Sequence, residues 1–258
     1  MPRYKLTLEY DGTGFVGWQY QGDGRSVQEA LERAVERFCG EQVRVHGAGR
    51  TDSGVHALGQ CCHLDLARQA EPAVLRDALN AHLRPAPAVV LDAAQTSPGF
   101  DARRDATMRV YLYRIVNRKT PLALAKDRAW HVARPLDANA MAEAARLLEG
   151  THDFTTFRAA HCQATSPVRT LKSLAVTRVG DEIAIRAWAR SFLHHQVRAM
   201  VGTLVEVGEG RRAPADVGAA LAARDRRQSG PTAPACGLYL EAVIYPPAER
   251  PAVPRATS

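Results

Sequence analysis

The two stretches that decide the fold are YKLTLEY (residues 4–10) and SVQEALERAVERFCG (residues 26–40). Apolar and polar side chains alternate in the first, which is typical of a half-buried strand, and the Asp-Gly pair after it predicts a turn. In the second, Ser26 and Glu29 form a capping box, apolar residues follow at helical spacing, and a glycine ends the helix. A strand and then a helix are therefore expected at the start of the chain.

Similar patterns continue along the chain and give the order β-α-β-β-α-β twice. In the first half we expect strands over 4–10, 42–46, 60–66 and 88–94, and helices over 26–39 and 72–83. In the second half we expect strands over 109–117, 171–179, 182–189 and 238–245, an added strand over 129–133, and helices over 137–148, 192–207 and 214–224. This order predicts an α+β fold of two ferredoxin-like, RNA-recognition-like halves. Joined edge to edge, they would form one mostly antiparallel sheet with helices packed on it and a cleft between the halves.

The predicted organisation has three parts. An N-terminal half covers residues 1–105 and contains a glycine-rich loop at 47–59, and a C-terminal half covers residues 106–245. Residues 246–258 hold four prolines and little apolar content, so we expect a flexible tail.

Composition and charge narrow the class of protein. The chain has 258 residues, of which 46% are hydrophobic and 24% charged, as in an ordinary globular protein. The formal net charge of +7 favours an anionic partner, with nucleic acid as the first candidate. The N-terminal segment lacks the apolar region of a secretory signal, and no stretch approaches the ~18 apolar residues that span a bilayer. We therefore expect a cytoplasmic protein without a membrane partner.

The five cysteines indicate reduced thiols rather than a disulfide framework. Their number is odd, their spacing is irregular and no CxxC pair occurs. The run Cys61-Cys62-His63 suggests a metal site at first, but neighbouring residues of a strand point to opposite faces and could not easily share one ion. No metal is expected.

The segment GAGRTDSGVH (residues 47–56) is the most informative loop. Its three glycines permit unusual dihedral angles and the close approach of another molecule. Asp52 stands in the middle of the loop, with Arg50 before it and His56 after it. On spacing alone, an aspartate that stabilises the loop through an Asx-turn is favoured over a reactive carboxylate.

The exact residues of this loop favour the reactive carboxylate. GRTDSGVH resembles the catalytic loop of the tRNA pseudouridine synthase A family, where GRTD-A-GVH is usual and Ser53 replaces the alanine. The resemblance covers nearly the whole chain. It includes YDGTGFVGWQYQ (10–21), SVQEALE (26–32), FDAR (100–103), YLYRI (111–115), HDFTTFR (152–158), SFLHHQVRAMVGTL (191–204) and GLYL (237–240).

The resemblance implies conversion of uridine to pseudouridine at positions 38, 39 and 40 of the tRNA anticodon arm, without cofactor or metal. It makes Asp52 the catalytic carboxylate. A carboxylate can attack an anomeric carbon, as in retaining glycosidases, or remove a ribose proton, and the sequence leaves both routes open. The chain contains no P-loop, no dinucleotide-binding fingerprint and no convincing metal spacing, in agreement with a reaction that needs no cofactor.

The same resemblance assigns further roles. Arg198 matches the basic residue that pairs with the aspartate, Tyr111 the tyrosine that stacks on the target base, and Leu238 an apolar residue lining the uracil pocket. Arg50 matches the residue that helps expel the base from its stem and hold its place. A surface arginine, a core aromatic and ordinary core packing are the competing interpretations for the first three. His56 is expected to orient the loop or contact RNA, and a structural hydrogen bond explains it too.

The other histidines and arginines are interpreted from their residue types and positions. His194 and His195 are assigned to packing and polar contacts. Two groups of basic residues are candidates for phosphate contacts: Arg103, Arg104, Arg109, Arg114, Arg118 and Lys119, and later Arg211, Arg212, Arg224, Arg226 and Arg227.

The resemblance also implies a homodimer that binds tRNA across both subunits. Two other classes remain open on the residues alone. A non-catalytic RNA-binding module would fit the fold and the charge but leaves the GRTDSGVH loop unexplained. A small-molecule enzyme on the same fold is compatible with the topology, because a fold does not determine a function.

Overall fold

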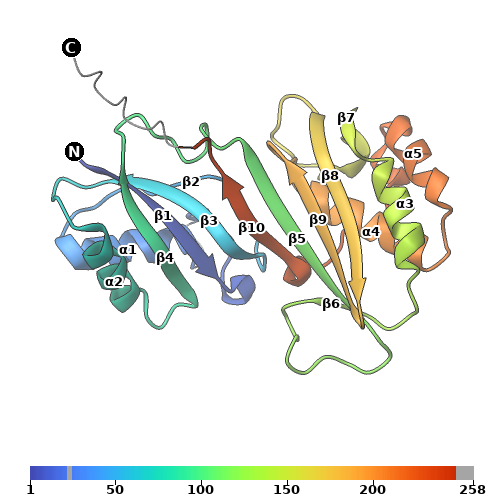
Figure 1. Cartoon of the computed structure of the whole chain (residues 1–258), viewed down its shortest axis with the longest axis horizontal. Helices are drawn as coiled ribbons and strands as arrows, with labels where there is room; N and C mark the ends of the chain where they lie inside the picture. Colours follow the sequence, from blue (N-terminus) through green and yellow to red (C-terminus); the bar gives the residue numbers. More distant parts are fainter. Residues whose placement is uncertain (22–24, 248–258) are drawn as a thin grey trace, which may run out of the picture.

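The computed structural model describes residues 1–21 and 25–247, and within them ten strands form a single sheet (Figure 1). The strands are β1 (Arg3–Tyr10), β2 (His46–Gly47), β3 (His56–Asp65), β4 (Ala88–Thr96), β5 (Met108–Asn117), β6 (Trp130–Val132), β7 (Gly150–Asp153), β8 (Val168–Val179), β9 (Glu182–Ala189) and β10 (Leu238–Ile244). The α-helices are α1 (Val27–Cys39), α2 (Pro72–Leu83), α3 (Ala138–Arg146), α4 (Gln196–Gly208) and α5 (Pro214–Ala223). Short 3-10 helices are η1 (Gly12–Gly14), η2 (Thr155–Phe157), η3 (Arg226–Gln228) and η4 (Ala235–Gly237).

The sheet order confirms two ferredoxin-like halves joined at their edges. The order is β4-β1-β3-β10-β5-β9-β8-β7, with β2 beside β3 and β6 beside β5. Each half thus has the arrangement fourth-first-third-second strand, as β4-β1-β3-β2 and as β10-β5-β9-β8. At the junction β10 runs parallel to β3, with Tyr239 opposite His56 and Leu240 opposite Ala57. The other pairs are antiparallel except β5 with β6, so the sheet is mostly antiparallel as expected.

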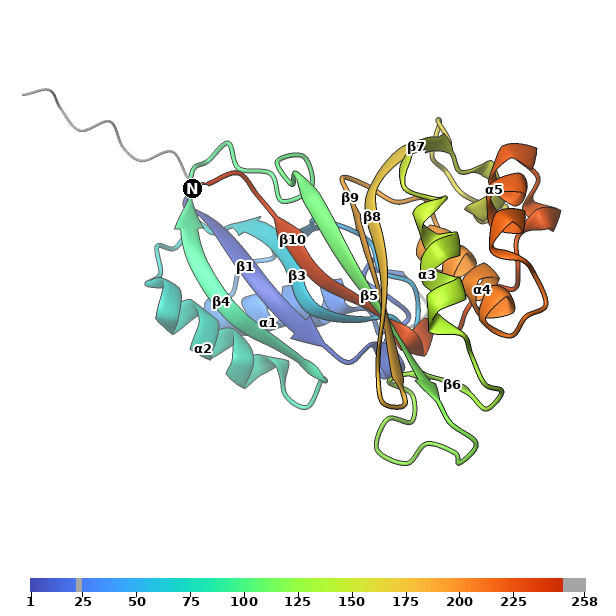
Figure 2. The same cartoon turned by 45° about the vertical axis from the view of Figure 1, so that its right-hand side comes forward.

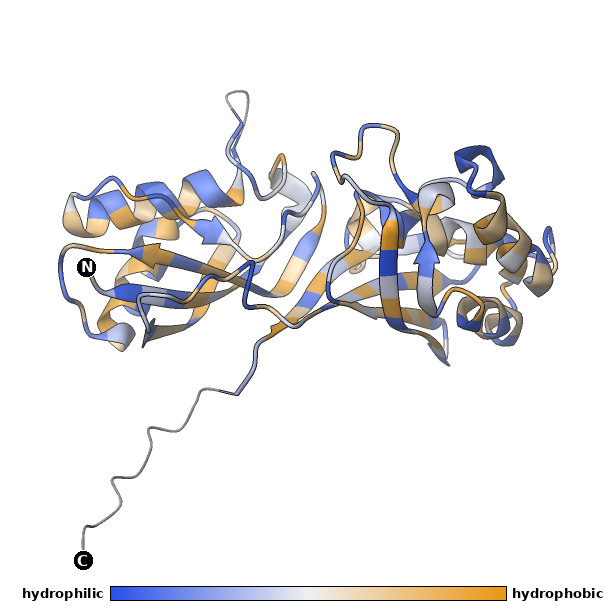
Figure 3. Ribbon diagram, turned by 90° about the horizontal axis from the view of Figure 1, so that it is seen from above, coloured by the Kyte–Doolittle hydropathy of each residue, from blue (hydrophilic) through white to orange (hydrophobic). Residues whose placement is uncertain are grey.

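Both sets of helices cover the same face of this sheet. Leu238 and Leu240 lie two positions apart on β10 and therefore point to the same face. Leu238 packs into the hydrophobic core of the C-terminal half, and Leu240 into that of the N-terminal half. Figure 3 shows the two helical groups on this face, and Figure 2 shows β10 and β5 passing between them. Two separate cores thus flank one junction, where Tyr111 contacts both.

The first strand and helix follow the predicted local rules. Tyr4, Leu6 and Leu8 of β1 are fully buried, while the residues between them are partly exposed. Ser26 Oγ accepts the N–H of Glu29 at 3.1 Å, and Gly40 ends α1 with a left-handed φ of 76°. The boundary between the halves near residue 105 stays a prediction, which the two separate cores support.

The strand predicted over 42–46 is wrong in its extent, because β2 contains His46 and Gly47 alone. Side chains of α1 satisfy the backbone of the preceding residue instead. Gln28 Nε2 donates to the carbonyl of Val45 at 3.2 Å, and Glu32 Oε1 accepts the N–H of Val45 at 3.0 Å. A segment whose polar groups are already satisfied by a helix has no need of a neighbouring strand.

Other boundaries also differ from the expectation. Strand β3 begins at His56 rather than at residue 60, so the last four residues of the loop predicted over 47–59 belong to a strand. The helix predicted from residue 192 begins at Gln196, because His195 has a φ of 62°, which a right-handed helix does not accommodate. The short edge strand β7 was not predicted, and its four residues pair with β8. Most of the predicted tail, residues 248–258, lies outside the described residues. No helix in the described part of the chain is long and apolar enough to cross a membrane.

Candidate active site

The loop that carries Asp52 rests directly on the segment that follows η1. The backbone N–H of Trp18 donates to the carbonyl of Thr51 at 3.0 Å, and Ser53 Oγ donates to the carbonyl of Phe15 at 3.2 Å. Gly17 has a φ of 107°, and a Cβ on it would stand 2.6 Å from the carbonyl oxygen of Thr51. The two backbones therefore touch, and only glycine fits at the contact.

Asp52 itself closes a tight turn. Its carbonyl accepts the N–H of Val55 at 3.1 Å, and Gly54 adopts a left-handed φ of 76° in between. Before the turn, Thr51 Oγ1 lies 2.8 Å from the buried hydroxyl of Tyr10 on β1. The carboxylate of Asp52 is thus carried on a loop whose backbone is fixed on both sides.

Three side chains from the other half of the molecule surround this carboxylate. Arg198 Nη1 lies 3.3 Å from Asp52 Oδ2, His195 Nε2 lies 3.3 Å from the same oxygen, and His194 Nε2 lies 3.3 Å from Oδ1. Asp52 and Arg198 are 146 residues apart in the chain. The side chain of Asp52 is 27% exposed and that of Arg198 is 14% exposed, so the pair is largely but not completely shielded from water.

The first turn of α4 positions these partners. Its following turns are almost entirely buried, so the helix is a rigid part of the C-terminal core. A Cβ on Gly202 would overlap the carbonyl oxygen of Pro231, which shows how closely the segment before β10 packs on α4. That segment presents the carbonyl of Ala233, which accepts from Arg198 Nε at 2.7 Å. The helix N-terminus adds a partial positive charge beside Asp52.

The electrostatics favour one permanent cation at the carboxylate. Burial lowers the pKa of His195, and the attraction of Asp52 opposes that shift without reversing it, while His194 and Arg198 add to the lowering. The imidazole of His195 is therefore neutral near pH 7, and Arg198 supplies the full positive charge. A carboxylate held between a guanidinium and a helix N-terminus can act as a nucleophile or a base.

Asp52, His194 and His195 also have the chemistry of metal ligands. One ligand atom from each lies within 4.8 Å of the others. Two imidazoles and a carboxylate are a donor set that zinc accepts. Arg198 approaches the same carboxylate and repels a second cation there.

Tyr111 of β5 provides an aromatic wall at the junction. It is partly exposed and meets Phe192 edge to face, with ring centroids 5.1 Å apart. Burial raises the pKa of its hydroxyl, and the nearby Tyr10 and Asp52 raise it further, so the phenol is neutral at pH 7. Tyr113, which points to the same face, is fully buried and donates its hydroxyl to the carbonyl of Pro234 at 2.7 Å. Of the two tyrosines, only Tyr111 is available to a ligand.

Comparisons with known proteins agree with this geometry. A family model described as tRNA pseudouridine synthase matches residues 7–103 and 144–246. The chain belongs to this family. Asp52 and Arg198 lie within the matched ranges, one in each.

Curated relatives cover almost the whole chain. The tRNA pseudouridine synthase A of Xanthobacter autotrophicus is 60% identical over 245 residues, which cover 95% of this chain and 100% of that protein. The protein of the same name from Azorhizobium caulinodans is 61% identical over 246 residues, covering 95% of each chain. That from Methylobacterium nodulans is 59% identical over 248 residues, covering 96% of this chain and 98% of its own.

In this family member His56 is a buried structural side chain. It is 2% exposed, its Nδ1 accepts the N–H of Gly12 at 3.0 Å, and its Nε2 donates to the carbonyl of Asp127 at 3.0 Å. The ring also stacks on Tyr239 with centroids 4.7 Å apart. Burial lowers the pKa of His56, and the attraction of Asp11 does not reverse the shift. These contacts tie the start of β3 to both halves and leave no ring nitrogen for a substrate.

Arg50 and Leu238 have contrasting environments. Arg50 is exposed, two residues before Asp52, where its guanidinium can reach a ligand. Leu238 is 6% exposed, belongs to the C-terminal core and stands opposite Tyr113 in the sheet. Leu238 is therefore a residue of the core.

Several arginines expected to contact phosphates have other partners. Arg109 is 8% exposed and donates to the carbonyls of Ala48 at 2.8 Å and Arg103 at 2.7 Å. Arg114 pairs with Glu182 at 2.7 Å. Arg109 is a structural residue, because its guanidinium is engaged by backbone carbonyls.

Sequence reasoning missed the direct contacts of His194 and His195 with Asp52. Their position just before Gln196, the first residue of α4, was a usable signal, because side chains at the start of a helix lie near those of its first turn, which includes Arg198. It also missed the support from residues 15–18, which pattern alone does not connect to the loop.

Proposed function

We propose that this family member isomerises uridine to pseudouridine at positions 38, 39 and 40 of the tRNA anticodon stem-loop, with Asp52 as the catalytic carboxylate. The contact of Asp52 with Arg198 carries the proposal. It brings together a carboxylate and a guanidinium from the two halves, one from each of the two family-matched ranges.

The reaction balances without an added reactant. The bond between uracil N1 and ribose C1′ breaks, a bond between C5 and C1′ forms, and the proton of C5 leaves while N1 gains one. Asp52 either attacks C1′ or removes a ribose proton, and both roles require the ionised form. Uracil departs as a resonance-stabilised anion, which explains why no second acid is required.

The surrounding residues receive roles that follow from their positions. Tyr111 stacks on the displaced uracil, since its partly exposed ring stands at the junction. Arg50 helps to expel the base from a stem, an opening that costs a few kcal/mol. Leu238 backs the uracil pocket from the core. His56 is a positioning residue for the loop.

We further propose that the protein acts on tRNA in the cytoplasm as a homodimer. The resemblance to the family supports the dimer, and the net charge of +7 supports an RNA partner. A non-catalytic RNA-binding module would have the same charge but no reason to keep Asp52 beside Arg198.

The decisive experiment measures tritium release from tRNA labelled at uracil C5. We expect release by the wild type, none by Asp52→Ala, and near-normal release by Ser53→Ala, a control in the same loop that restores the alanine usual in the family. Binding of tRNA by the Asp52 variant must be intact. If the wild type releases no tritium from unmodified tRNA, the synthase proposal fails. Equal release by wild type and Asp52→Ala would remove Asp52 from the reaction.

A further inference from the structure

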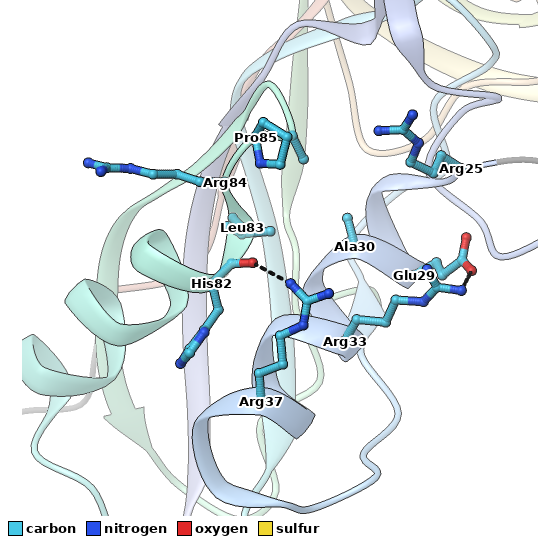
Figure 4. A pocket seen from close by; sticks show the side chains of 10 residues that line it. Arg25, Glu29, Ala30, Arg33, Arg37, His82, Leu83, Arg84 and Pro85 are labelled. Atoms are coloured by element: carbon cyan, nitrogen blue, oxygen red, sulfur yellow. Dashed lines mark hydrogen bonds and ion pairs between the residues drawn. The ribbon is translucent and has the colours of Figure 1, made fainter.

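A groove lined by arginines runs along α1, away from Asp52. Helix α1 forms one wall, and the turn after α2 forms the other (Figure 4). The cavity has a volume of about 250 Å³. Its charged lining consists of Arg25, Arg33, Arg37 and Arg84 against one carboxylate, Glu29.

The arginines of this groove are not equivalent. Arg33 is already paired with Glu29 at 2.8 Å, and Figure 4 shows Arg84 extending away along the rim. In the same view the guanidinium of Arg25 lies above Ala30, whereas that of Arg37 lies below it and points to the carbonyl of His82. Arg37 has one long hydrogen bond, of 3.4 Å, to the carbonyl of His82. Neither Arg25 nor Arg37 has a carboxylate partner among the residues that line the groove, so both are candidate ligands for an anion.

Charge and shape together favour an anion. With Glu29 assigned to Arg33, the other arginines that line the groove have no carboxylate among the lining residues, and an anion in the groove reduces the repulsion between them. Guanidinium groups bind phosphate oxygens through paired N–H donors. The apolar floor, which includes Leu83 and Pro85, offers nothing to compete with such a ligand.

The groove begins at the end of α1 that supports the Asp52 loop. The carbonyl of Arg25 accepts the N–H of Val16 at 3.0 Å, and Val27 donates to the carbonyl of Gly17 at 3.1 Å. Gly17 in turn packs against Thr51, the neighbour of Asp52. An RNA whose target base reaches Asp52 can therefore continue over the start of α1.

We propose that this groove binds a backbone phosphate of the tRNA, outside the nucleotide that is modified, with Arg25 and Arg37 as its main ligands. The inference rests on the proposed function for the identity of the RNA. An acidic protein is a less suitable occupant, because the cavity is small and its donors match the oxygens of a single phosphate.

The test compares paired substitutions by filter binding of full-length tRNA at several salt concentrations. The variant Arg25→Gln with Arg37→Gln should weaken binding about 10-fold at moderate salt. The slope of log K against log salt should decrease in magnitude by about 0.7–0.9 for each phosphate that the variant no longer neutralises. Arg25→Lys with Arg37→Lys should keep most of the slope, because the charge remains. As the matched control, Arg76→Gln with Arg146→Gln removes two helix arginines outside the groove and should change neither quantity.

Two outcomes would overturn the proposal. One is an affinity and slope for the glutamine pair that equal those of the control pair. The other is a weaker affinity with an unchanged slope, since that result would mean that the variant still neutralises every phosphate that the wild type does. Failure of the proposed function has a different signature, because the wild type would then release no tritium from tRNA however tightly it binds. Thermal melting of each variant confirms that it is folded.

Discussion

Arg198 joins the carboxylate of Asp52 to the carbonyl of Ala233, with Nη1 3.3 Å from Oδ2 and Nε 2.7 Å from the carbonyl oxygen. One guanidinium thereby connects the loop of the N-terminal half to two elements of the C-terminal half. A lysine has a single nitrogen and cannot reproduce both bonds at once. The position of the Asp52 carboxylate therefore depends on the shape of the arginine as well as on its charge.

Replacing Arg198 separates these contributions. A hydrogen bond to a charged group contributes ~1.5–3 kcal/mol. Loss of that amount from the transition state slows a reaction by ~10- to 150-fold. We expect Arg198→Met to reduce single-turnover tritium release in this range and Arg198→Lys to give an intermediate rate. Wild-type rates for the methionine variant at saturating tRNA would contradict the role of the guanidinium.

Tyr111 and Tyr113 should differ in what each contributes, Tyr111 to the reaction rate through its ring and Tyr113 to the stability of the fold through its hydroxyl. Tyr111→Phe keeps the ring and should retain most activity, whereas Tyr111→Leu removes a base-stacking surface worth ~1–3 kcal/mol. Tyr113→Phe breaks the bond to Pro234 and should lower stability by ~1 kcal/mol with little effect on the rate. Single-turnover rates and urea unfolding measure the two effects. A Tyr111→Leu variant as active as Tyr111→Phe would exclude stacking by this residue.

Arg50 is expected to matter most where the target uridine is paired. Opening a base pair costs a few kcal/mol that a loop uridine does not require. Arg50→Ala should therefore reduce turnover more at position 39 or 40, in the stem, than at position 38, in the loop. Site-by-site mapping of pseudouridine in the same tRNA provides the measurement. Equal losses at stem and loop positions would remove the role in base expulsion.

Local patterns explain what the sequence could predict of the fold. The alternation in β1 and the cap and stop of α1 are written in adjacent residues, and both elements were predicted within a residue or two. The prediction of a strand over 42–46 was wrong because Glu32 and Gln28, on helix α1, form hydrogen bonds with the backbone of Val45. The predicted start of α4 was wrong because His195 adopts a left-handed backbone conformation, whose energetic cost only tertiary contacts can compensate.

The candidate site could be predicted from its resemblance to a family motif, and not from residue types and spacing alone. Spacing alone left Asp52 as a turn residue, and only the resemblance linked it to Arg198, 146 residues away. The contacts of His194 and His195 with the carboxylate had no local signal of comparable strength. Contacts between the two halves depend on how β3 and β10 align, which no short stretch of sequence encodes.

Gly17 provides a test of how rigidly the Asp52 loop is held. A methyl group at Gly17 would combine a φ of 107° with a contact of 2.6 Å to the Thr51 carbonyl, so the loop must shift. Gly17→Ala should lower activity at least 10-fold, since a displacement of about 1 Å can cost 10²-fold in rate. Gly14→Ala is the control, because no atom lies within 4 Å of a Cβ there. Retention of full activity by Gly17→Ala would show that the loop adapts.

Because His56 is buried, the free energy of unfolding should fall when the solution is made mildly acidic. Its folded-state pKa is lowered from 6.5 by burial, so the unfolded chain binds a proton more readily than the folded one. The stability associated with neutral His56 is therefore complete above about pH 6.5 and is lost as the pH falls through the lowered folded-state pKa. The loss amounts to ~1.4 kcal/mol for each pH unit that separates the folded-state pKa from the unfolded-state pKa. His63, which accepts the N–H of Ala102 at 3.0 Å and also has a pKa lowered by burial, adds in the same direction.

Urea unfolding between pH 7.5 and pH 5 measures this loss. We expect His56→Gln to be less stable at pH 7.5 and to show a shallower decline toward pH 5, because the titrating group is gone. His161→Gln, a substitution of an exposed histidine, should leave the slope of the wild type. The carboxylates Asp65 and Glu182, whose pKa values are lowered by Arg3 and Arg114, contribute only at lower pH and do not overlap this window. If His56→Gln declined as steeply as the wild type, the titration would have to be assigned to another group.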